Sequence, residues 1–407
     1  MLLLLLATGC GTTRHPRIAV TPDISAEYQP IDIHVRGLAA YQRVTLTLRS
    51  TDASGVPFVS HARFRADARG ALDLAHAPAK SGSYTGTWRM GLVTSMEPVA
   101  PRTQAPYDFD RSARRFTVTV GSNGRTIAAA SFKRSLTLTP LVVRRPTVSH
   151  DGFQGTFAAP KDAAHVPAAL ELGGSEGGPK GPATEQAANG IPVLFVGYFH
   201  AHGLPDDLKN IPLEYFRRAL LWLRRQPEVD PNRITVMGTS YGSEAALLLG
   251  VHYPSLVHAV AAIVPSGVVT CAIPGAGRQA GRCLGSPWSL NGRPVPYTKQ
   301  WGVTDPTDEP RAVIPVERIK GAVLLTCAGL DDEWPSCHYA SAIVDRLRAR
   351  HFRFHVALYR YPEAGHVGAQ VDAPFWPGTL ALDEFAPSDE HARERLWPRA
   401  LAFLRRG

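Results

Sequence analysis

The sequence predicts two domains of different classes: an all-β sandwich first, and then an α/β domain with a mostly parallel sheet. Three observations predict this arrangement. The chain has 407 residues, whereas single domains usually have about 100–200. Short β-branched and apolar stretches separated by turn residues fill the first third of the chain. Beyond residue 157, strand-like stretches alternate with longer helical patterns.

Composition supports a folded protein and argues against one class of partner. Hydrophobic residues make up 44% of the chain, which is enough for a substantial core. The 44 basic and 35 acidic residues give a formal charge of +9. No run of basic residues is interleaved with aromatic residues, so we do not expect nucleic-acid binding.

The first ten residues, MLLLLLATGC, place small residues directly between a short apolar stretch and Cys10. This layout resembles a bacterial lipoprotein signal. We therefore expect residues 1–16 to be leader and linker, with Cys10 lipidated and the mature protein attached to a membrane outside the cytoplasm. The alternative is a frayed N-terminal arm of a cytoplasmic protein. An apolar stretch this short cannot span a bilayer.

The remaining four cysteines form two local sets. Cys271 and Cys283 lie in a Gly/Pro-rich segment, and Cys327 and Cys337 lie ten residues apart further along the chain. Two local disulfides fit this spacing. Because disulfides persist in oxidising compartments, this pairing agrees with export. The alternative, four unpaired core cysteines, is what a cytosolic location would require.

The first domain, residues 17–145, reads as an antiparallel sandwich. Turn sequences such as Asp-Ala-Ser-Gly separate its strands, and no helical pattern is long enough to cross over a parallel sheet. No nucleophile, base and acid stand out in it, so we expect a structural role. The expected strands are 31–35, 44–48, 58–64, 71–74, 116–120 and 136–143.

The second domain, residues 150–407, reads as a parallel sheet with crossover helices. The strand-like stretches are 168–172, 192–196, 234–237, 257–264, 322–326 and 354–359. The helical patterns between and after them are 212–225, 240–253, 336–350 and 391–405.

A Gly-x-Ser-x-Gly motif, residues 238–242, joins the strand at 234–237 to the helix that follows. A strand, a sharp glycine turn and a helix are what a nucleophile elbow of the α/β-hydrolase fold requires, so Ser240 is the predicted nucleophile. The motif alone is a weak signal, and its context supplies the specificity.

A Gly-rich loop, residues 173–178, follows an earlier strand of the same domain. Such a loop can direct backbone N–H groups at a developing oxyanion. We expect the oxyanion hole to use the N–H of Tyr241 and one from Gly174 or Ser175. The alternatives are a linker or a phosphate-binding turn, but the spacing of a P-loop and of a dinucleotide site are both missing.

The order Ser, Asp, His along the chain is typical of this fold, and the later two members follow strands. Asp331 and Asp332 follow the strand at 322–326, and His366 follows the strand at 354–359. We expect His366 to be the base and one aspartate to orient it. The alternatives are a surface histidine and a helix cap, and one aspartate is expected to be only a cap.

His200 and His202 form a His-x-His in a loop, without further ligands at metal spacing. We therefore expect no zinc site, and no other metal or cofactor.

Several longer strings resemble the acyl-CoA thioesterase and bile acid-CoA:amino acid N-acyltransferase family. In the first domain they are Ile-His-Val-Arg-Gly-Leu at 33–38, Gly-Ser-Tyr at 82–84, Met-Gly-Leu at 90–92 and Ser-Met at 95–96. In the second they include the Gly-rich loop, the elbow, Tyr-Phe at 198–199, Leu-Pro at 204–205, Ile-Pro-Leu-Glu-Tyr-Phe at 211–216, and the segments 329–334 and 361–366.

The resemblance implies an immunoglobulin-like first domain and an α/β-hydrolase second domain. It implies a triad of Ser240, Asp332 and His366, because the family's motif selects the second aspartate. A serine nucleophile is similar to the thioesterase branch, since the conjugating branch uses cysteine. The sequence departs from the family at Tyr241, where the elbow commonly carries lysine.

The resulting hypothesis is hydrolysis of a fatty-acyl thioester, a small-molecule substrate, to free acid and thiol through an acyl-enzyme. The alternatives are an exported carboxylesterase and an acyltransferase that uses an amine or alcohol acceptor. The last alternative is a non-catalytic, lipid-anchored binding protein on the same fold.

Overall fold

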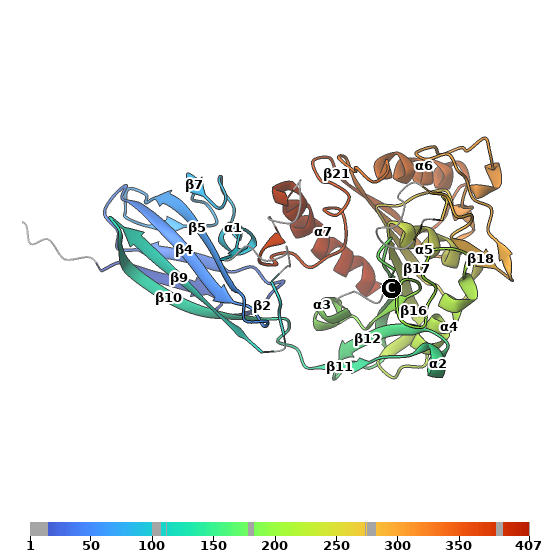
Figure 1. Ribbon diagram of the computed structural model, residues 1–407, viewed down its shortest axis with the longest axis horizontal. Coiled ribbons are helices and arrows are strands. Elements are labelled where there is room, and N and C mark those ends of the chain that lie inside the picture. Colours follow the sequence, from blue (N-terminus) through green and yellow to red (C-terminus); the bar gives the residue numbers. More distant parts are fainter. Residues whose placement is uncertain are drawn as a thin grey trace, which may run out of the picture. The chain divides into compact units, whose positions relative to one another are not determined.

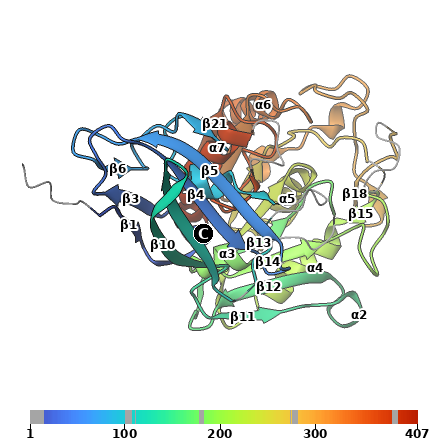
Figure 2. The same ribbon diagram turned by 60° about the vertical axis from the view of Figure 1, so that its left-hand side comes forward.

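The computed structural model describes residues 15–99, 107–110, 112–177, 183–272, 274, 282–379 and 386–406. Cys10, most of the predicted leader and Gly178 therefore lie outside the described residues. The chain forms two compact units (Figures 1 and 2). Unit 1 comprises residues 1–136 and 375–383, and unit 2 comprises residues 137–374 and 384–407.

In its described residues, unit 1 contains two sheets and one short helix, α1 (Gly91–Thr94). The smaller sheet has the order β1-β3-β6, formed by β1 (Arg17–Thr21), β3 (Asp32–Arg36) and β6 (Leu72–Asp73). The larger sheet has the order β2-β10-β9-β4-β5-β7, with β8 also paired to β5. Its strands are β2 (Ile24–Ala26), β4 (Arg43–Thr51), β5 (Pro57–Arg65), β7 (Ser81–Gly82), β8 (Glu97–Pro98), β9 (Arg114–Ser122) and β10 (Arg125–Ser135).

Alternating burial explains the long strands of unit 1. In β4, the side chains of Val44, Leu46 and Leu48 are buried and their neighbours are more exposed. This period of two is what a strand with one face on a core requires. In the described residues of unit 1, the four-residue α1 is the one helix, and the other regular elements are strands.

Two boundary predictions were wrong. The predicted sandwich strand at 136–143 contributes instead β11 (Leu141–Arg144), which pairs antiparallel with β12 (Gln154–Pro160) in unit 2. The segment 375–383, predicted within the catalytic domain, belongs to unit 1. There Phe375 is part of the core, and the indole N–H of Trp376 donates to the Tyr107 carbonyl at 2.7 Å. An apolar pattern shows that a segment is buried, but it does not show whether the segment packs in the core of unit 1 or in that of unit 2.

Unit 2 contains an eight-stranded sheet of order β11-β12-β14-β13-β16-β17-β20-β21. The strands from β14 to β21 run parallel, and β11 and β12 are antiparallel, so the predicted, mostly parallel sheet is present. The parallel strands are β13 (Val166–Leu172), β14 (Val193–Gly197), β16 (Val229–Thr239), β17 (Ala259–Ile263), β20 (Ala322–Ala328) and β21 (Val356–Tyr361).

The helices of unit 2 are α2 (Val148–Asp151), α3 (Ala183–Ala188), α4 (Leu213–Leu223), α5 (Tyr241–His252), α6 (Ser336–Ala349) and α7 (Ala386–Arg406). The short elements β15 (Ile211–Pro212), β18 (Trp288–Leu290) and β19 (Arg293–Pro294) form a small sheet. The 3₁₀ turns are η1 (Pro310–Ala312) and η2 (Val316–Arg318). Among the described residues, no helix is long and apolar enough to cross a membrane.

The core of unit 2 surrounds the helix that follows the nucleophile. Every residue of α5 from Tyr241 to Val251 is buried, and so is all of β17. Strands of a parallel sheet are covered on both faces, which is why their sequences are continuous apolar runs. The carboxyl ends of the parallel strands lie at one edge of the sheet, and the loops that leave this edge carry the predicted site residues.

Candidate active site

Ser240 lies at the sharp turn between β16 and α5, with φ 54° and ψ −123°. A positive φ is costly for a residue with a Cβ, and it persists only where the surroundings enforce it. The glycines of the motif provide the space. A Cβ on Gly238 would lie 1.9 Å from the Gly242 carbonyl oxygen, and one on Gly242 would lie 2.3 Å from the Gly173 carbonyl oxygen. This is the geometry of a nucleophile elbow.

The Gly-rich loop lies against the nucleophile, as predicted. A Cβ on Gly174 would lie 3.0 Å from the Cβ of Ser240 and 3.5 Å from its Oγ. Ser175, the alternative residue, is exposed. The Tyr241 N–H belongs to the first residue of α5, so it has no partner within the helix.

Two residues of this loop region have roles that sequence reasoning missed. The buried Tyr198 hydroxyl contacts the carbonyl oxygens of Gly173 and Gly174 at 2.5 and 3.0 Å, and these contacts hold the loop. The Gly174 N–H donates to both carboxylate oxygens of Glu176, at 2.9 Å each. The predicted oxyanion donor therefore already has an acceptor.

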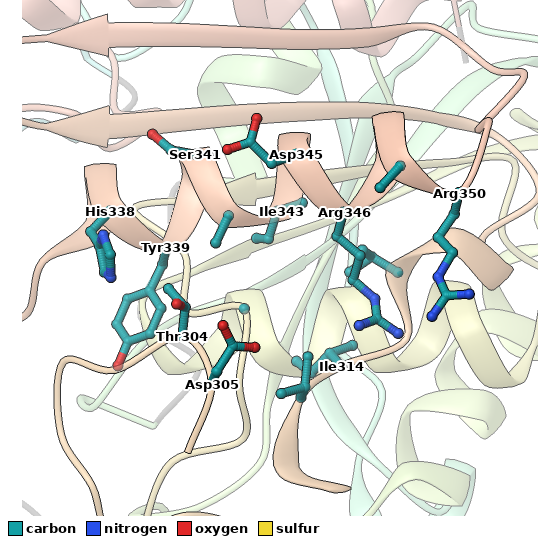
Figure 3. Close-up of a pocket in the computed structure, with 15 residues that line it drawn as sticks. Thr304, Asp305, Ile314, His338, Tyr339, Ser341, Ile343, Asp345, Arg346 and Arg350 are labelled. Carbon is teal, nitrogen blue, oxygen red and sulfur yellow. The ribbon is translucent and has the colours of Figure 1, made fainter. Parts of the chain in front are cut away.

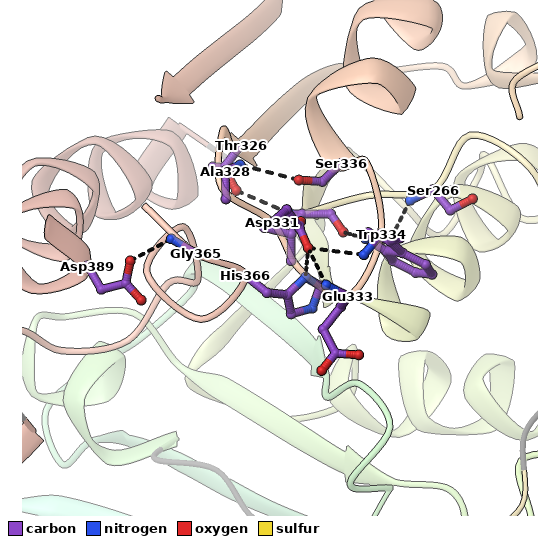
Figure 4. A network of polar contacts seen from close by, with 12 residues as sticks. Ser266, Thr326, Ala328, Asp331, Glu333, Trp334, Ser336, Gly365, His366 and Asp389 are labelled. Carbon is purple, nitrogen blue, oxygen red and sulfur yellow. Dashed lines mark hydrogen bonds and ion pairs between the residues drawn. The ribbon is translucent and has the colours of Figure 1, made fainter. Parts of the chain in front are cut away.

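Of the two predicted candidates for the acid, Asp331 is the one that contacts His366 (Figure 4). The Nδ1 of His366 lies 2.8 Å from Oδ1 of Asp331, and the two side chains are only 9% and 2% exposed. Because a carboxylate only accepts, Nδ1 carries the proton and Nε2 keeps the lone pair that a general base needs. Asp332, the predicted partner of His366, is exposed, and the contact with His366 is made by Asp331 instead.

Asp331 also caps its own loop. Its Oδ1 accepts the backbone N–H groups of Glu333 and Trp334 at 3.2 Å each. One aspartate was expected to cap the helix and the other to orient the base, whereas Asp331 makes both kinds of contact. The motif of adjacent aspartates could not separate them, because the loop conformation decides which side chain points inward.

Trp334 links the nucleophile turn to the base. Its ring centroid lies 5.5 Å from that of Tyr241 and 6.0 Å from that of His366, and its indole N–H donates to the Val264 carbonyl. Within the described residues, no hydrogen bond joins Ser240 to His366. Such bonds tighten when substrate binds, so this geometry is compatible with a working pair.

Three contacts hold the loops of the acid and base in place. The Leu330 N–H donates to the Ala364 carbonyl at 3.0 Å, and the Thr326 hydroxyl donates to the Ala369 carbonyl at 2.8 Å. The Gly365 N–H donates to Oδ1 of Asp389, a buried residue of α7, at 2.7 Å. Sequence reasoning gave no signal for Asp389.

Both pairs of cysteines form disulfides in the structure. Cys271–Cys283 joins Cα atoms 5.4 Å apart, and Cys327–Cys337 joins Cα atoms 4.8 Å apart. The second bond connects the end of β20 to the start of α6, so it closes the loop that carries Asp331. The first lies near the nucleophile turn, where the Tyr241 hydroxyl donates to the Cys271 carbonyl at 2.9 Å.

Two buried glutamates lie near the site and differ in their partners. Burial raises the pKa of Glu171 to about 8, and the charges of Asp372 and Glu176 act in the same direction. Burial also raises the pKa of Glu244 to about 8, although hydrogen bonds from Thr270 and Trp288 act to lower this pKa. These bonds tie the segments at 270 and 288 to α5, which Glu244 belongs to.

Among the described residues, no cluster of three or more His, Cys, Asp or Glu side chains could hold a metal ion. His200 and His202 are both exposed.

A cavity of about 570 Å³ lies along α6, and no triad residue lines it (Figure 3). Tyr339 and Arg346 of α6 line it, and so does Arg350, which directly follows the helix. Arg346 is held in a two-bond ion pair with Glu317 at 2.7 and 2.9 Å.

Comparison with known proteins places both units in one family. Residues 28–148 match the model described as acyl-CoA thioester hydrolase/BAAT N-terminal region, and residues 211–382 match BAAT / acyl-CoA thioester hydrolase C terminal. Acyl-coenzyme A thioesterase 6 of Mus musculus is 31% identical over 88% of this chain and 85% of its own. Acyl-coenzyme A thioesterase 1 of Homo sapiens is 32% identical over 86% and 84%.

Solved structures resemble the chain more distantly. A dienelactone hydrolase-type protein from Klebsiella pneumoniae has a TM-score of 0.43 and 15% identity, covering 65% of this chain and 98% of its own. An esterase from Pyrobaculum calidifontis has a TM-score of 0.42 and 16% identity, covering 65% and 85%.

Proposed function

The chain belongs to the acyl-CoA thioester hydrolase and BAAT family, and from this premise we propose that it hydrolyses a fatty-acyl thioester to a free acid and a thiol. The protein is a hydrolase, and the proposal concerns its substrate and its mechanism. The observation that carries the mechanism is the buried Asp331–His366 contact together with the strained turn at Ser240.

In the proposed reaction, Ser240 Oγ bonds to the acyl carbon while its proton passes to His366 Nε2. The carbon–sulfur bond breaks and the departing sulfur takes that proton. A water molecule then loses its proton to Nε2 and attacks the acyl carbon, which releases the acid and restores Ser240. Asp331 orients the imidazole and stabilises its charged form in both steps.

Exposed apolar side chains beside the triad support an alkyl chain on the substrate. Leu330 is 47% exposed and precedes Asp331, and Val367 is 41% exposed and follows His366. Trp301 is 50% exposed, and its ring packs against Trp334 at 5.6 Å. Large apolar groups in solvent are costly to expose, and here they adjoin the reacting residues.

A second candidate, an exported carboxylesterase, is favoured by the two disulfides. Such bonds persist in oxidising compartments, whereas coenzyme A thioesters are cytosolic metabolites.

We also propose that Cys10 is lipidated and anchors the protein outside the cytoplasm, and that unit 1 is an immunoglobulin-like, non-catalytic domain. Mass spectrometry of the N-terminal peptide from membranes would detect the lipid, and an unmodified Met1 would exclude processing.

The test uses protein lacking residues 1–10 and its Ser240→Ala variant, assayed against acyl-CoA thioesters and carboxylic esters of matched chain length. We expect thiol release by the first and a loss of about 10⁴-fold or more in the second. Cleavage of esters alone would favour the carboxylesterase. Unchanged activity in Ser240→Ala, with an unchanged melting temperature, would exclude Ser240 as nucleophile.

A further inference from the structure

The turn of Gly173 and Gly174 forms a cradle that is filled by the carboxylate of Glu176. The Gly174 N–H donates to Oε1 and Oε2 of Glu176 at 2.9 Å each. A Cβ on Gly173 would lie 1.9 Å from Oε1, and one on Gly174 would lie 3.2 Å from Oε2. A side chain at position 173 would overlap Oε1 of Glu176 where it now lies, and one at position 174 would be in tight contact with Oε2. The cradle therefore accommodates a negatively charged oxygen.

The same cradle borders the nucleophile. The point that a Cβ on Gly174 would occupy lies 3.5 Å from Ser240 Oγ and 3.2 Å from Oε2 of Glu176. When Ser240 attacks, the oxygen of the tetrahedral intermediate must find N–H donors close to the Oγ. Glu176 thus occupies the donor that the intermediate would use.

The donor is fixed, whereas its present acceptor is free to move. The Tyr198 hydroxyl bridges the carbonyl oxygens of Gly173 and Gly174, so this peptide cannot turn its N–H away without breaking buried hydrogen bonds. Glu176 is exposed, and a glutamate side chain can rotate into water at little cost.

We propose that the carboxylate of Glu176 occupies the oxyanion donor of Gly174 in the free enzyme and withdraws into solvent when the carbonyl oxygen of the substrate enters. The inference rests on the proposed function, because it requires attack by Ser240 on a carbonyl. Substrate and carboxylate compete for one N–H group. Every turnover therefore includes the loss of the Glu176 contact.

Competition for the donor has a specific kinetic signature. Removal of the carboxylate leaves the donor open, so kcat/KM and the affinity for a ligand that forms an oxyanion rise by the same factor. A hydrogen bond to a charged acceptor corresponds to about a tenfold effect. A ligand without a carbonyl oxygen does not use the donor, so its affinity stays unchanged.

The test compares Glu176→Ala and Glu176→Gln with Glu333→Gln, which removes another exposed charge near Tyr241 without freeing an N–H. Three quantities are measured on each variant: kcat/KM on p-nitrophenyl esters and acyl-CoA, Ki for an alkyl trifluoromethyl ketone, and Kd for a thioether analogue of acyl-CoA. Trifluoromethyl ketones add to the serine and form an oxyanion, and thioethers do not.

We expect Glu176→Ala to raise kcat/KM and lower Ki by about tenfold each, Glu176→Gln to change both less, and the thioether Kd to stay within about twofold. Glu333→Gln is expected to change none of them beyond about twofold. Lower activity in Glu176→Ala, an unchanged Ki, or tighter thioether binding of equal size would overturn the inference. If Ser240→Ala kept full activity, the proposed function would fail instead, which separates the two outcomes.

Discussion

The nucleophile turn and the acid–base loops form two halves of one site, but they are built in different ways. Ser240 is positioned mainly by its own neighbours, Gly238 and Gly242, whose missing side chains allow the turn. His366 depends on partners that are distant in the sequence: Asp331 lies 35 residues before it, and Asp389, which holds Gly365, lies 24 residues after that glycine. The first half is thus encoded locally, and the second half depends on tertiary structure.

The sharpest test of the second half is the pair Asp331→Asn and Asp332→Asn. Asparagine at 331 can donate to Nδ1 and favour the wrong tautomer of His366, so we expect kcat to fall by about 10³–10⁴-fold. Asp332 is exposed, and Asp332→Asn is expected to stay within about twofold of the parent. The kcat of both variants is measured on the same substrate. A large loss of kcat in Asp332→Asn would instead assign Asp332 as the partner of His366.

The next prediction concerns the disulfide Cys327–Cys337, which closes the loop that carries Asp331, called the acid loop below. Replacing both cysteines by alanine frees the loop around Asp331, so we expect kcat to fall about tenfold and the free energy of unfolding to fall by about 2–4 kcal/mol. Denaturant unfolding and kinetics measure the two effects. The double variant of Cys271 and Cys283 is the matched control, since it leaves the acid loop closed. Equal losses of kcat in both variants would contradict a specific role for the acid-loop bond.

The next prediction concerns the contact between Asp389 of α7 and the turn that precedes His366. Asp389→Ala leaves the Gly365 N–H without its acceptor, which costs about 1–3 kcal/mol of stability, and it loosens the turn before His366. We expect kcat to fall severalfold with KM little changed. Asp389→Asn keeps an acceptor oxygen and should recover most of kcat. If alanine and asparagine were equally active, the contact would not matter for positioning His366.

These contrasts explain what the sequence could predict. The elbow, its glycines and the Gly-rich loop were found because their signal lies in a few consecutive residues. The choice between Asp331 and Asp332 failed, since adjacent residues in a loop have no periodicity that reveals their orientation. The contacts of Glu176 with Gly174 and of Asp389 with Gly365 have no sequence signature. Strand β11 was recognised as a strand but assigned to the wrong sheet.

A further prediction concerns Glu171, on the strand that leads into the Gly-rich loop. Its pKa rises from 4.5 to about 8 on folding, chiefly because of burial. Between these values the folded protein holds a proton that the unfolded chain has released, so the free energy of unfolding decreases as pH rises through this window. Glu171→Gln should flatten that decrease. Urea unfolding at pH 5 and pH 8 measures it, and equal pH slopes in both proteins would contradict a buried, neutral Glu171.

The segment 375–383 has a consequence for inheritance. It follows the loop of His366 and precedes α7, yet its aromatic residues Phe375 and Trp376 belong to the core of unit 1. A single genetic crossover near residue 136 would separate the first sheets from part of their own core. The two units are therefore expected to be transmitted and exchanged together, and a fragment ending at residue 145 should be less stable than unit 1 in the intact chain.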